Sequence, residues 1–202
     1  MKAPFLDVIH NHPLSFFKTI GVGGFIHVPF YTIVGYMNPT LHTKGMISSV
    51  ELMFMNMAVT LIGVIVIPVF GHYSDKIGQQ RLMSWGALGQ IGLILPVFIV
   101  YTGGGSLVWI LGAQMTLLMF AEAYVAPSNA YLNSLFPPEC RYSGVAFGSC
   151  LGAALFGGTT PLICSQFASF FGPLGPSFYV MGMAFLALMA VKEIKTRIFL
   201  VH

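Results

Sequence analysis

Glu122 is the only acidic residue that lies well within a long apolar run of this sequence. A carboxyl group can take up and release a proton, but an ionised carboxylate near the centre of a bilayer costs about 2.5 to 3.5 kcal/mol even on insertion scales. The side chain of Glu122 must therefore be protonated, paired with another group, or turned toward a wet cavity. The structural alternative is that it reaches the membrane surface or bonds to a neighbouring helix.

A second concentration of reactive groups is the polar segment 71–83, in a chain of which only 7% of the residues are charged. Its acid, its bases and its turn-forming glycines are Asp75, Lys76, Arg81, Gly71 and Gly78. Glycine permits a sharp turn, and a carboxylate is stabilised at a helix N-terminus or beside a base. The segment is therefore expected to be a loop between two helices. The alternative is an ordinary loop that has collected bases.

Four further polar residues are expected at membrane depth, namely His27, Asn56, Gln114 and Gln166. Such side chains more often join helices by hydrogen bonds than contact a ligand. Tyr31 lies one turn beyond His27 and could supply an aromatic wall for a cationic group. The sequence contains no phosphate-binding loop, no metalloprotease helix pattern and no nucleophile with a placed base, so we do not expect an enzyme.

The elements that must position these residues are membrane-spanning helices. Hydrophobic residues make up 56% of the chain and the mean hydropathy is +0.81, which is too apolar for a soluble domain. Uniformly apolar runs also exclude an outer-membrane barrel, whose strands alternate. At roughly 20 residues per crossing, we predict an all-α integral membrane fold, a single domain over residues 1–202. The predicted spans are 19–37, 52–70, 82–101, 107–131, 143–171 and 177–191.

The basic residues predict the orientation. With six spans, all the bases but one fall on the side of the two termini, and Lys44 falls on the other; the majority are Lys2, Lys18, Lys76, Arg81, Arg141, Lys192, Lys195 and Arg197. Positive charge marks the cytoplasmic side, so we expect a multi-pass protein of the plasma (inner) membrane with both termini in the cytoplasm.

The remaining composition points to no bound cofactor. Cys140, Cys150 and Cys164 have no zinc or redox spacing, so neither a metal site nor a disulfide framework is expected. The net charge of +3 is distributed by side and gives no sign of nucleic-acid binding.

Two groups of residues resemble a known family. The pattern Gly71-x-x-Ser74-Asp75-Lys76-x-Gly78-x-x-Arg81 is similar to the signature loop of the major facilitator superfamily, with Lys76 in place of an arginine. The stretches Leu135-Phe136-Pro137, Arg141-Tyr142-Ser143-Gly144 and Phe156-Gly-Gly-Thr-Thr-Pro-Leu162 resemble the region between the tenth and eleventh helices of its metabolite:proton symporters. That branch includes proline/betaine transporters and organic-acid carriers. With Asn11-His12-Pro13-Leu14, the likeness covers essentially the whole chain and aligns it with the carboxyl-terminal six helices of a twelve-helix family.

This resemblance implies a secondary transporter, or half of one, that moves a small metabolite such as proline, betaine or an organic acid by proton symport. In such folds the substrate site lies near the midplane between two repeats. The implied gating residues are Gly71, Ser74, Asp75, Lys76, Gly78, Arg81 and Arg141, with Asp75 expected to meet Arg141 or the start of the fifth span. The implied substrate and proton residues are Glu122, His27, Tyr31, Asn56, Gln114 and Gln166.

The implied partners are a solute, protons, the lipid bilayer, and an amino-terminal half-transporter or a second copy. One alternative stays open. The chain could be a truncated or split half-carrier that has no transport activity alone and acts only beside a partner half.

Overall fold

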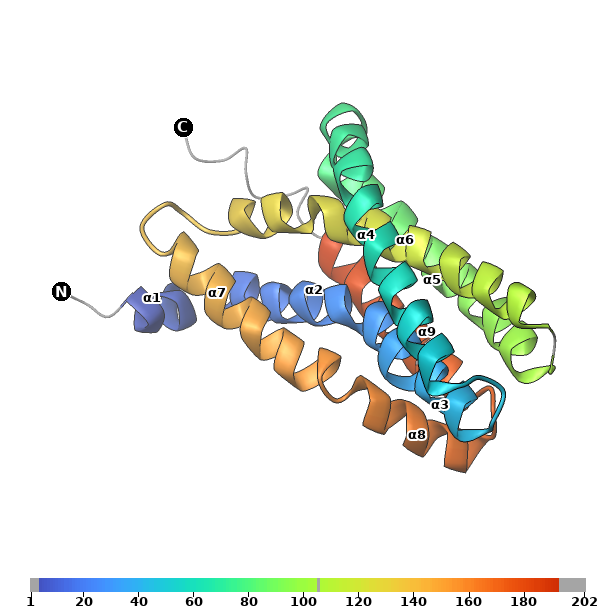
Figure 1. Ribbon diagram of the computed structural model, residues 1–202. Coiled ribbons are helices and arrows are strands. Elements are labelled where there is room, and N and C mark those ends of the chain that lie inside the picture. The colour runs from blue at the N-terminus through green and yellow to red at the C-terminus, as the bar shows by residue number, and fades with distance from the viewer. Residues whose placement is uncertain (1–3, 105, 193–202) are drawn as a thin grey trace.

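The computed structural model describes residues 4–104 and 106–192, and every regular element in that part of the chain is a helix (Figure 1). Two short π-helical segments, η1 and η2, continue α-helices. The elements are α1 (Pro4–Asn11), α2 (Pro13–Tyr31), η1 (Thr32–Met37), α3 (Asn38–Thr43), α4 (Ser49–Ile77), α5 (Gln79–Thr102), α6 (Leu107–Ser134), α7 (Arg141–Gly152), η2 (Ala153–Gly157), α8 (Thr160–Phe171) and α9 (Gly175–Lys192). The predicted all-α membrane fold is confirmed.

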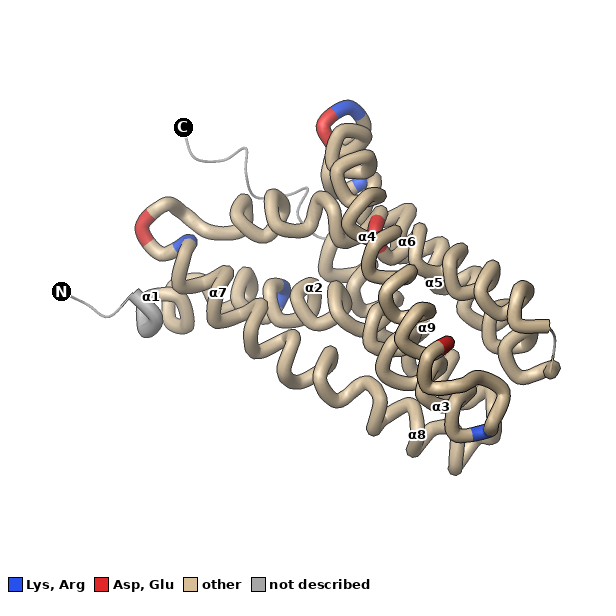
Figure 2. Tube along the Cα trace, in the orientation of Figure 1, with Lys and Arg blue, Asp and Glu red and all other residues tan. Residues whose placement is uncertain are grey.

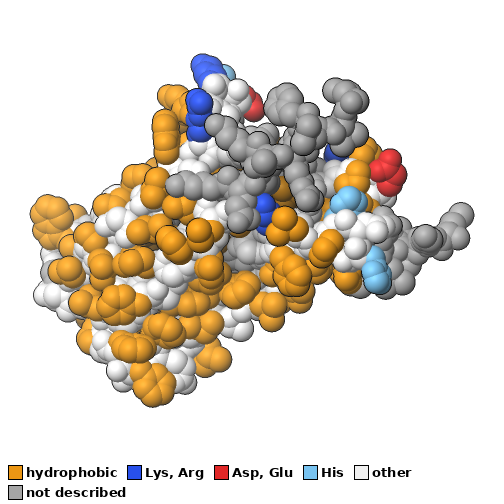
Figure 3. Space-filling model, turned by 180° about the vertical axis from the view of Figure 1, so that it is seen from behind, with side chains coloured by type: hydrophobic (Ala, Val, Ile, Leu, Met, Phe, Trp, Pro, Cys, Tyr) orange, Lys and Arg blue, Asp and Glu red, His pale blue; other side chains and the backbone are white. Residues whose placement is uncertain are grey.

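In the part of the chain that the structure describes, five helical segments are long and apolar enough to cross a membrane, and a shorter apolar helix covers Gly175–Val191. The long segments are Pro13–Thr43, Ser49–Ile77, Gln79–Thr102, Leu107–Ser134 and Arg141–Phe171. Their outer surfaces are apolar, as Figure 3 shows for one face, where hydrophobic side chains cover most of the lower part and charged groups gather along the upper and right margins. Such a surface is suited to lipid contact.

Helix α2 lies at the centre of the bundle and packs against α7, α9 and α6, while α5 packs against α6 and α9. Helix α4 is different, because it packs mainly on α6 and leaves most of its sides uncovered. Ile65 in its middle, for example, is 67% exposed. The second crossing segment is therefore the least enclosed of the long helices.

Glycines bring α2 and α7 together at backbone distance. A Cβ added at Gly23 would lie 2.8 Å from the Cα of Ser149, and one added at Gly24 would lie 3.2 Å from the carbonyl oxygen of Gly152. Small residues on facing helices allow close approach in membranes, where there is no hydrophobic force between helices. Gly23, Gly24 and Gly152 thus form a glycine seam that holds α7 against α2.

Two crossing segments change their helical geometry partway. The first passes from α2 through η1 into α3, and the fifth passes from α7 through η2 and the turn at Gly158 into α8. The predicted interruption at residues 157–161 is therefore present. The first segment continues to Thr43, past the predicted span end at Met37, because η1 absorbs the change of register ahead of Pro39.

Charged positions gather at the α4–α5 turn and along the α6–α7 connection, while the opposite end of the bundle carries Lys44 and Glu51 around the α3–α4 connection (Figure 2). Lys2, Lys195 and Arg197, which entered the count of bases, lie outside the described residues.

Candidate functional site

The polar segment that was predicted to be a loop is mostly helical. Helix α4 continues to Ile77, and α5 begins at Gln79, so Gly78 alone separates them. Gly78 has φ 98°, a conformation that side chains with a Cβ rarely adopt, and its N–H donates to the carbonyl oxygen of Ser74 at 2.8 Å. Gly71 lies within the helix. The prediction of a sharp turn at Gly78 agrees with the structure, whereas an extended loop over residues 71–77 was wrong, because nothing before Gly78 ends the helical hydrogen bonding.

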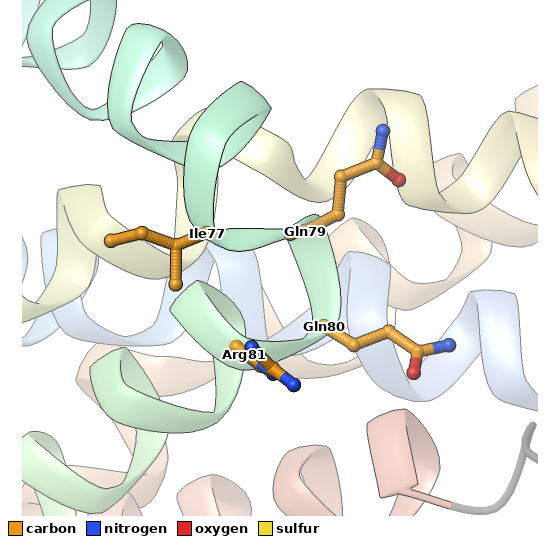
Figure 4. Close-up of a pocket in the computed structure, with 5 residues that line it drawn as sticks. Ile77, Gln79, Gln80 and Arg81 are labelled. Atoms are coloured by element: carbon orange, nitrogen blue, oxygen red, sulfur yellow. The ribbon is translucent and has the colours of Figure 1, made fainter.

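The side chains around this turn do not converge. Residues 77–81 line a shallow open hollow, and in the close-up Ile77, Gln79, Gln80 and Arg81 point in different directions (Figure 4). Asp75, Lys76 and Arg81 are exposed, whereas Ser74 is buried. The turn thus offers separate charges to the aqueous side and no enclosed ligand site.

The expected contact between Asp75 and the start of α7 is not formed among the described residues. Arg141 donates from Nε to the carbonyl oxygen of Phe136 at 3.3 Å, within its own connection. The ring of Phe136 also lies against Gly144, 2.6 Å from where a Cβ would be. Because the glycine seam commits α7 to α2, the start of α7 packs near α1 and α6 and away from the end of α4.

Three amide side chains form a chain of hydrogen bonds inside the bundle. Gln114 of α6 donates from Nε2 to Oδ1 of Asn38 at 2.8 Å, and Asn38 donates from Nδ2 to Oδ1 of Asn56 of α4 at 2.8 Å. Asn38 and Gln114 are fully buried, and Asn56 is half-buried. The structure therefore joins two predicted candidates, Asn56 and Gln114, through a third residue and connects the first, second and fourth crossing segments.

Sequence reasoning missed Asn38. The pair Asn38-Pro39 was read as the end of the first span, because proline disfavours a helix ahead of it. The signal that could have identified it is its side chain, since an asparagine this close to an apolar run needs a hydrogen-bond partner. Beside it, the hydroxyl of Tyr101 donates to the carbonyl oxygen of Met37 at 3.1 Å and adds a link to α5.

Glu122 lies in the middle of α6 and faces α4. Its side chain is 8% exposed, and its Oε2 is buried without a hydrogen-bond partner in the described ranges 4–104 and 106–192. Its Oε1 lies 2.9 Å from the position that a Cβ would take at Gly63. The carboxyl group is thus accommodated because residue 63 has no side chain.

The remaining candidates lie apart from the amide chain. The rings of His27 and Tyr31 are 6.3 Å apart, and a Cβ at Gly157 of η2 would lie 2.6 Å from the Cβ of His27. His27 is half-buried and Tyr31 is 38% exposed, so this pair forms a wall beside η2. Gln166 lies on an exposed face of α8, apart from the other candidates.

Comparison with known proteins gives a consistent set of relatives. The chain is 25% identical over 185 residues to the ectoine/proline transporter ProP of Corynebacterium glutamicum, covering 91% of this chain and 36% of that protein. It is 32% identical over 136 residues to a protein of Haemophilus influenzae that is named as a metabolite transport protein, covering 65% of this chain and 30% of that protein. A Staphylococcus aureus protein assigned as a proline/betaine transporter is 24% identical over 191 residues, covering 93% and 40%.

No family model and no solved structure matches the chain. The chain spans between 30% and 40% of the length of these three relatives. It is a membrane protein related to transporters of the major facilitator type, as the residues of the α4–α5 turn and of the α6–α7 region predicted.

Proposed function

We propose that this relative of the major-facilitator-type transporters forms one six-helix half of a proton-coupled carrier for a small metabolite, such as proline, betaine or an organic acid. The observation that carries the proposal is the similarity to transporters over 91% of the chain. It is supported by ordered polar groups, the amide chain and Glu122, inside an otherwise apolar bundle. The carrier moves its solute without chemical change, in the plasma membrane, with both termini in the cytoplasm.

The amide chain is suited to the polar part of such a solute. Asn56 is the half-buried end of the chain, and with its Oδ1 held by Asn38 its Nδ2 is directed to donate elsewhere. A solute carboxylate accepts hydrogen bonds of this kind and gains from a charged acceptor. The wall of His27 and Tyr31 is suited to a quaternary ammonium or other cationic group by contact with the Tyr31 ring.

Glu122 is the proposed proton carrier. It is a carboxyl group at the middle of a membrane-length helix, where the ionised form is costly. Within the part of the chain that the structure describes, its Oε2 has no hydrogen-bond partner that would compensate for an ionised state. A group of this kind changes charge when its surroundings become wet, which is what coupling to a proton gradient requires.

A second six-helix unit completes the path in this proposal. A substrate site between two repeats needs an opposite wall. Helix α4, which carries Asn56 of the amide chain, has uncovered sides that face no other helix of this bundle. The second unit is a partner half or a second copy of the chain. The second candidate function is therefore a half-carrier that is inactive alone.

Uptake by proteoliposomes tests both candidates. The purified chain is reconstituted alone and together with the amino-terminal half of a relative, and uptake of radiolabelled proline, betaine and an organic acid is measured with and without an imposed pH gradient. Gradient-stimulated uptake by the chain alone supports a carrier that assembles from copies, and uptake only in the mixture supports the half-carrier. No uptake of any solute in either preparation contradicts the transport proposal.

The role of Glu122 is tested in whichever preparation transports. Glu122→Gln keeps the shape of the side chain but cannot ionise, so uptake should lose its stimulation by the pH gradient. Glu139→Gln, at an exposed position in the α6–α7 connection, is the matched control and should keep it. Unchanged proton dependence in Glu122→Gln removes this residue from the coupling mechanism.

A further inference from the structure

We propose that Glu122 and Gly63 form a proton-sensitive contact between α6 and α4, which closes when the carboxyl group is protonated and opens when it ionises. This inference deepens the proposed transport function, because it names the movement to which the proton is coupled. It makes Gly63 a positioning residue, which no property of the sequence singled out.

The geometry gives α4 and α6 a contact that depends on the state of one carboxyl group. Oε1 of Glu122 lies 2.9 Å from the position of a Cβ at Gly63, so the helices meet where the carboxyl rests on bare backbone. On the opposite side of α6, the backbone around Phe120 and Tyr124 approaches Gly86 of α5, with 2.8 Å from the carbonyl oxygen of Phe120 to an added Cβ. Helix α6 is thus held on one side by backbone packing and on the other by Glu122.

The charged and titratable side chains of the neighbouring helices do not neutralise this carboxyl. Within the described residues of α2, α4, α5 and α7 they are Lys18, His27, Tyr31, Glu51, His72, Tyr73, Asp75, Lys76, Arg81, Tyr101, Arg141, Tyr142 and Cys150. Arg141 bonds to the carbonyl oxygen of Phe136. The bases of α4, His72 and Lys76, are nine and thirteen residues from Gly63, which is roughly 14 and 20 Å along a helix. His27 packs on η2, and Tyr101 bonds to Met37. Oε2 of Glu122 has no partner among the described residues.

The direction of the effect follows from hydration. With no base to pair with among the described residues, an ionised carboxylate is stable only when water reaches it. Helix α4 packs mainly on α6 and has few contacts with the other helices, so the hydration of Glu122 acts on the interface that holds α4 in place. The protonated form therefore favours the closed contact, and the ionised form favours separation. With a single proton involved, the ratio of closed to open forms changes by at most about tenfold for each pH unit.

Distances between spin labels on the two helices test this contact without any transport. The three cysteines are replaced by alanine, and labels are placed at the exposed positions Ile65 of α4 and Thr116 of α6. In wild-type chain in liposomes, double electron–electron resonance should show a short distance at acidic pH and a growing population at longer distance as the pH rises. In Glu122→Gln, the short distance should persist over the whole pH range.

Gly63→Ala supplies the second arm. Its methyl group would occupy the place of the carboxyl oxygen, so the open population should rise at acidic pH, and combining it with Glu122→Ala should restore the short distance. Gly112→Ala on α6, where an added Cβ meets nothing within 4 Å, is the control and should behave as wild type. A wild-type distance that does not respond to pH, or a response that Glu122→Gln retains, overturns the proposal.

These outcomes separate the contact from the transport function. A pH-dependent distance without uptake supports the contact and contradicts the carrier. Uptake with a distance that ignores pH supports the carrier and contradicts the contact.

Discussion

Removal of the Asn38 side chain should destabilise the bundle more than any other single amide substitution. In Asn38→Ala, both hydrogen bonds of the amide chain are lost, the 2.8 Å bond from Gln114 and the 2.8 Å bond to Asn56. Hydrogen bonds between membrane helices contribute about 0.6 kcal/mol on average and up to about 1.7. The two bonds together give a loss of about 1 to 3 kcal/mol in the free energy of unfolding.

Burial decides where in this range the loss falls. Gln114 is fully buried, so water cannot replace Asn38 as the acceptor for its Nε2 in the variant. A buried donor without an acceptor costs about 1 to 3 kcal/mol by itself. Asn56 is half-buried and can turn toward water. The upper part of the range is therefore expected, with most of it arising on the α6 side.

The measurement is equilibrium unfolding in mixed micelles with increasing SDS, followed by circular dichroism. The matched control is Asn133→Ala, which removes a bond to the carbonyl oxygen of Asn129 within α6 and should change the free energy by less than about 0.5 kcal/mol. A double-mutant cycle of Asn38→Ala with Asn56→Ala should give a coupling of about 0.6 to 1.7 kcal/mol. Equal effects of Asn38→Ala and Asn133→Ala, or a coupling near zero, would refute the reasoning.

Two further stability predictions follow from the glycines, by the same unfolding measurement. Gly152→Ala should lower the free energy of unfolding by about 1 to 3 kcal/mol, because its Cβ would meet the carbonyl oxygen of Ile20 on α2. Gly21→Ala, where an added Cβ has nothing within 4 Å, should be nearly neutral. Equal effects of the two substitutions would contradict close backbone packing between α7 and α2. Gly78→Ala should lower the free energy of unfolding by about 1 kcal/mol or more, because φ at this residue is 98°. Gly71→Ala, within helix α4, should not destabilise the protein. A neutral Gly78→Ala would show that the turn relaxes and would contradict the prediction.

Local features of the fold were predictable, and contacts between distant segments were not. Long apolar runs predicted the crossing helices, and Gly78 predicted the turn, because hydropathy and the ability of glycine to adopt a positive φ are properties of the residues themselves. The pairing of Asp75 with Arg141 was wrong because it required the relative positions of α4 and α7, which the glycine seam decides. The role of Gly63 depends on α6 and leaves no mark on the sequence of α4.

The candidate site shows the same division. Asn56, Gln114 and Glu122 could be proposed as candidates because a polar residue in an apolar run is conspicuous and costly to leave without a partner. Asn38 was assigned to a span end, since the continuation of the helix through η1 could not be read from Asn-Pro. Tertiary packing then determined that Asn56 and Gln114 are joined through Asn38, whereas Oε2 of Glu122 has no partner among the described residues.

Helix α4 differs from its neighbours in what holds it. Between membrane helices, lipid leaves no net hydrophobic attraction, so close backbone packing and hydrogen bonds decide where a helix lies. Helix α5 has close packing, since a Cβ at Gly86 would lie 2.8 Å from backbone of α6. Helix α4 has the bond of Asn56 to Asn38 near one end and the contact of Gly63 with Glu122 in its middle. If the contact with Glu122 opens while the hydrogen bond of Asn56 stays, α4 pivots about Asn56. The displacement is then largest at the α4–α5 turn, so protonation of Glu122 controls the position of the exposed charges of residues 75–81.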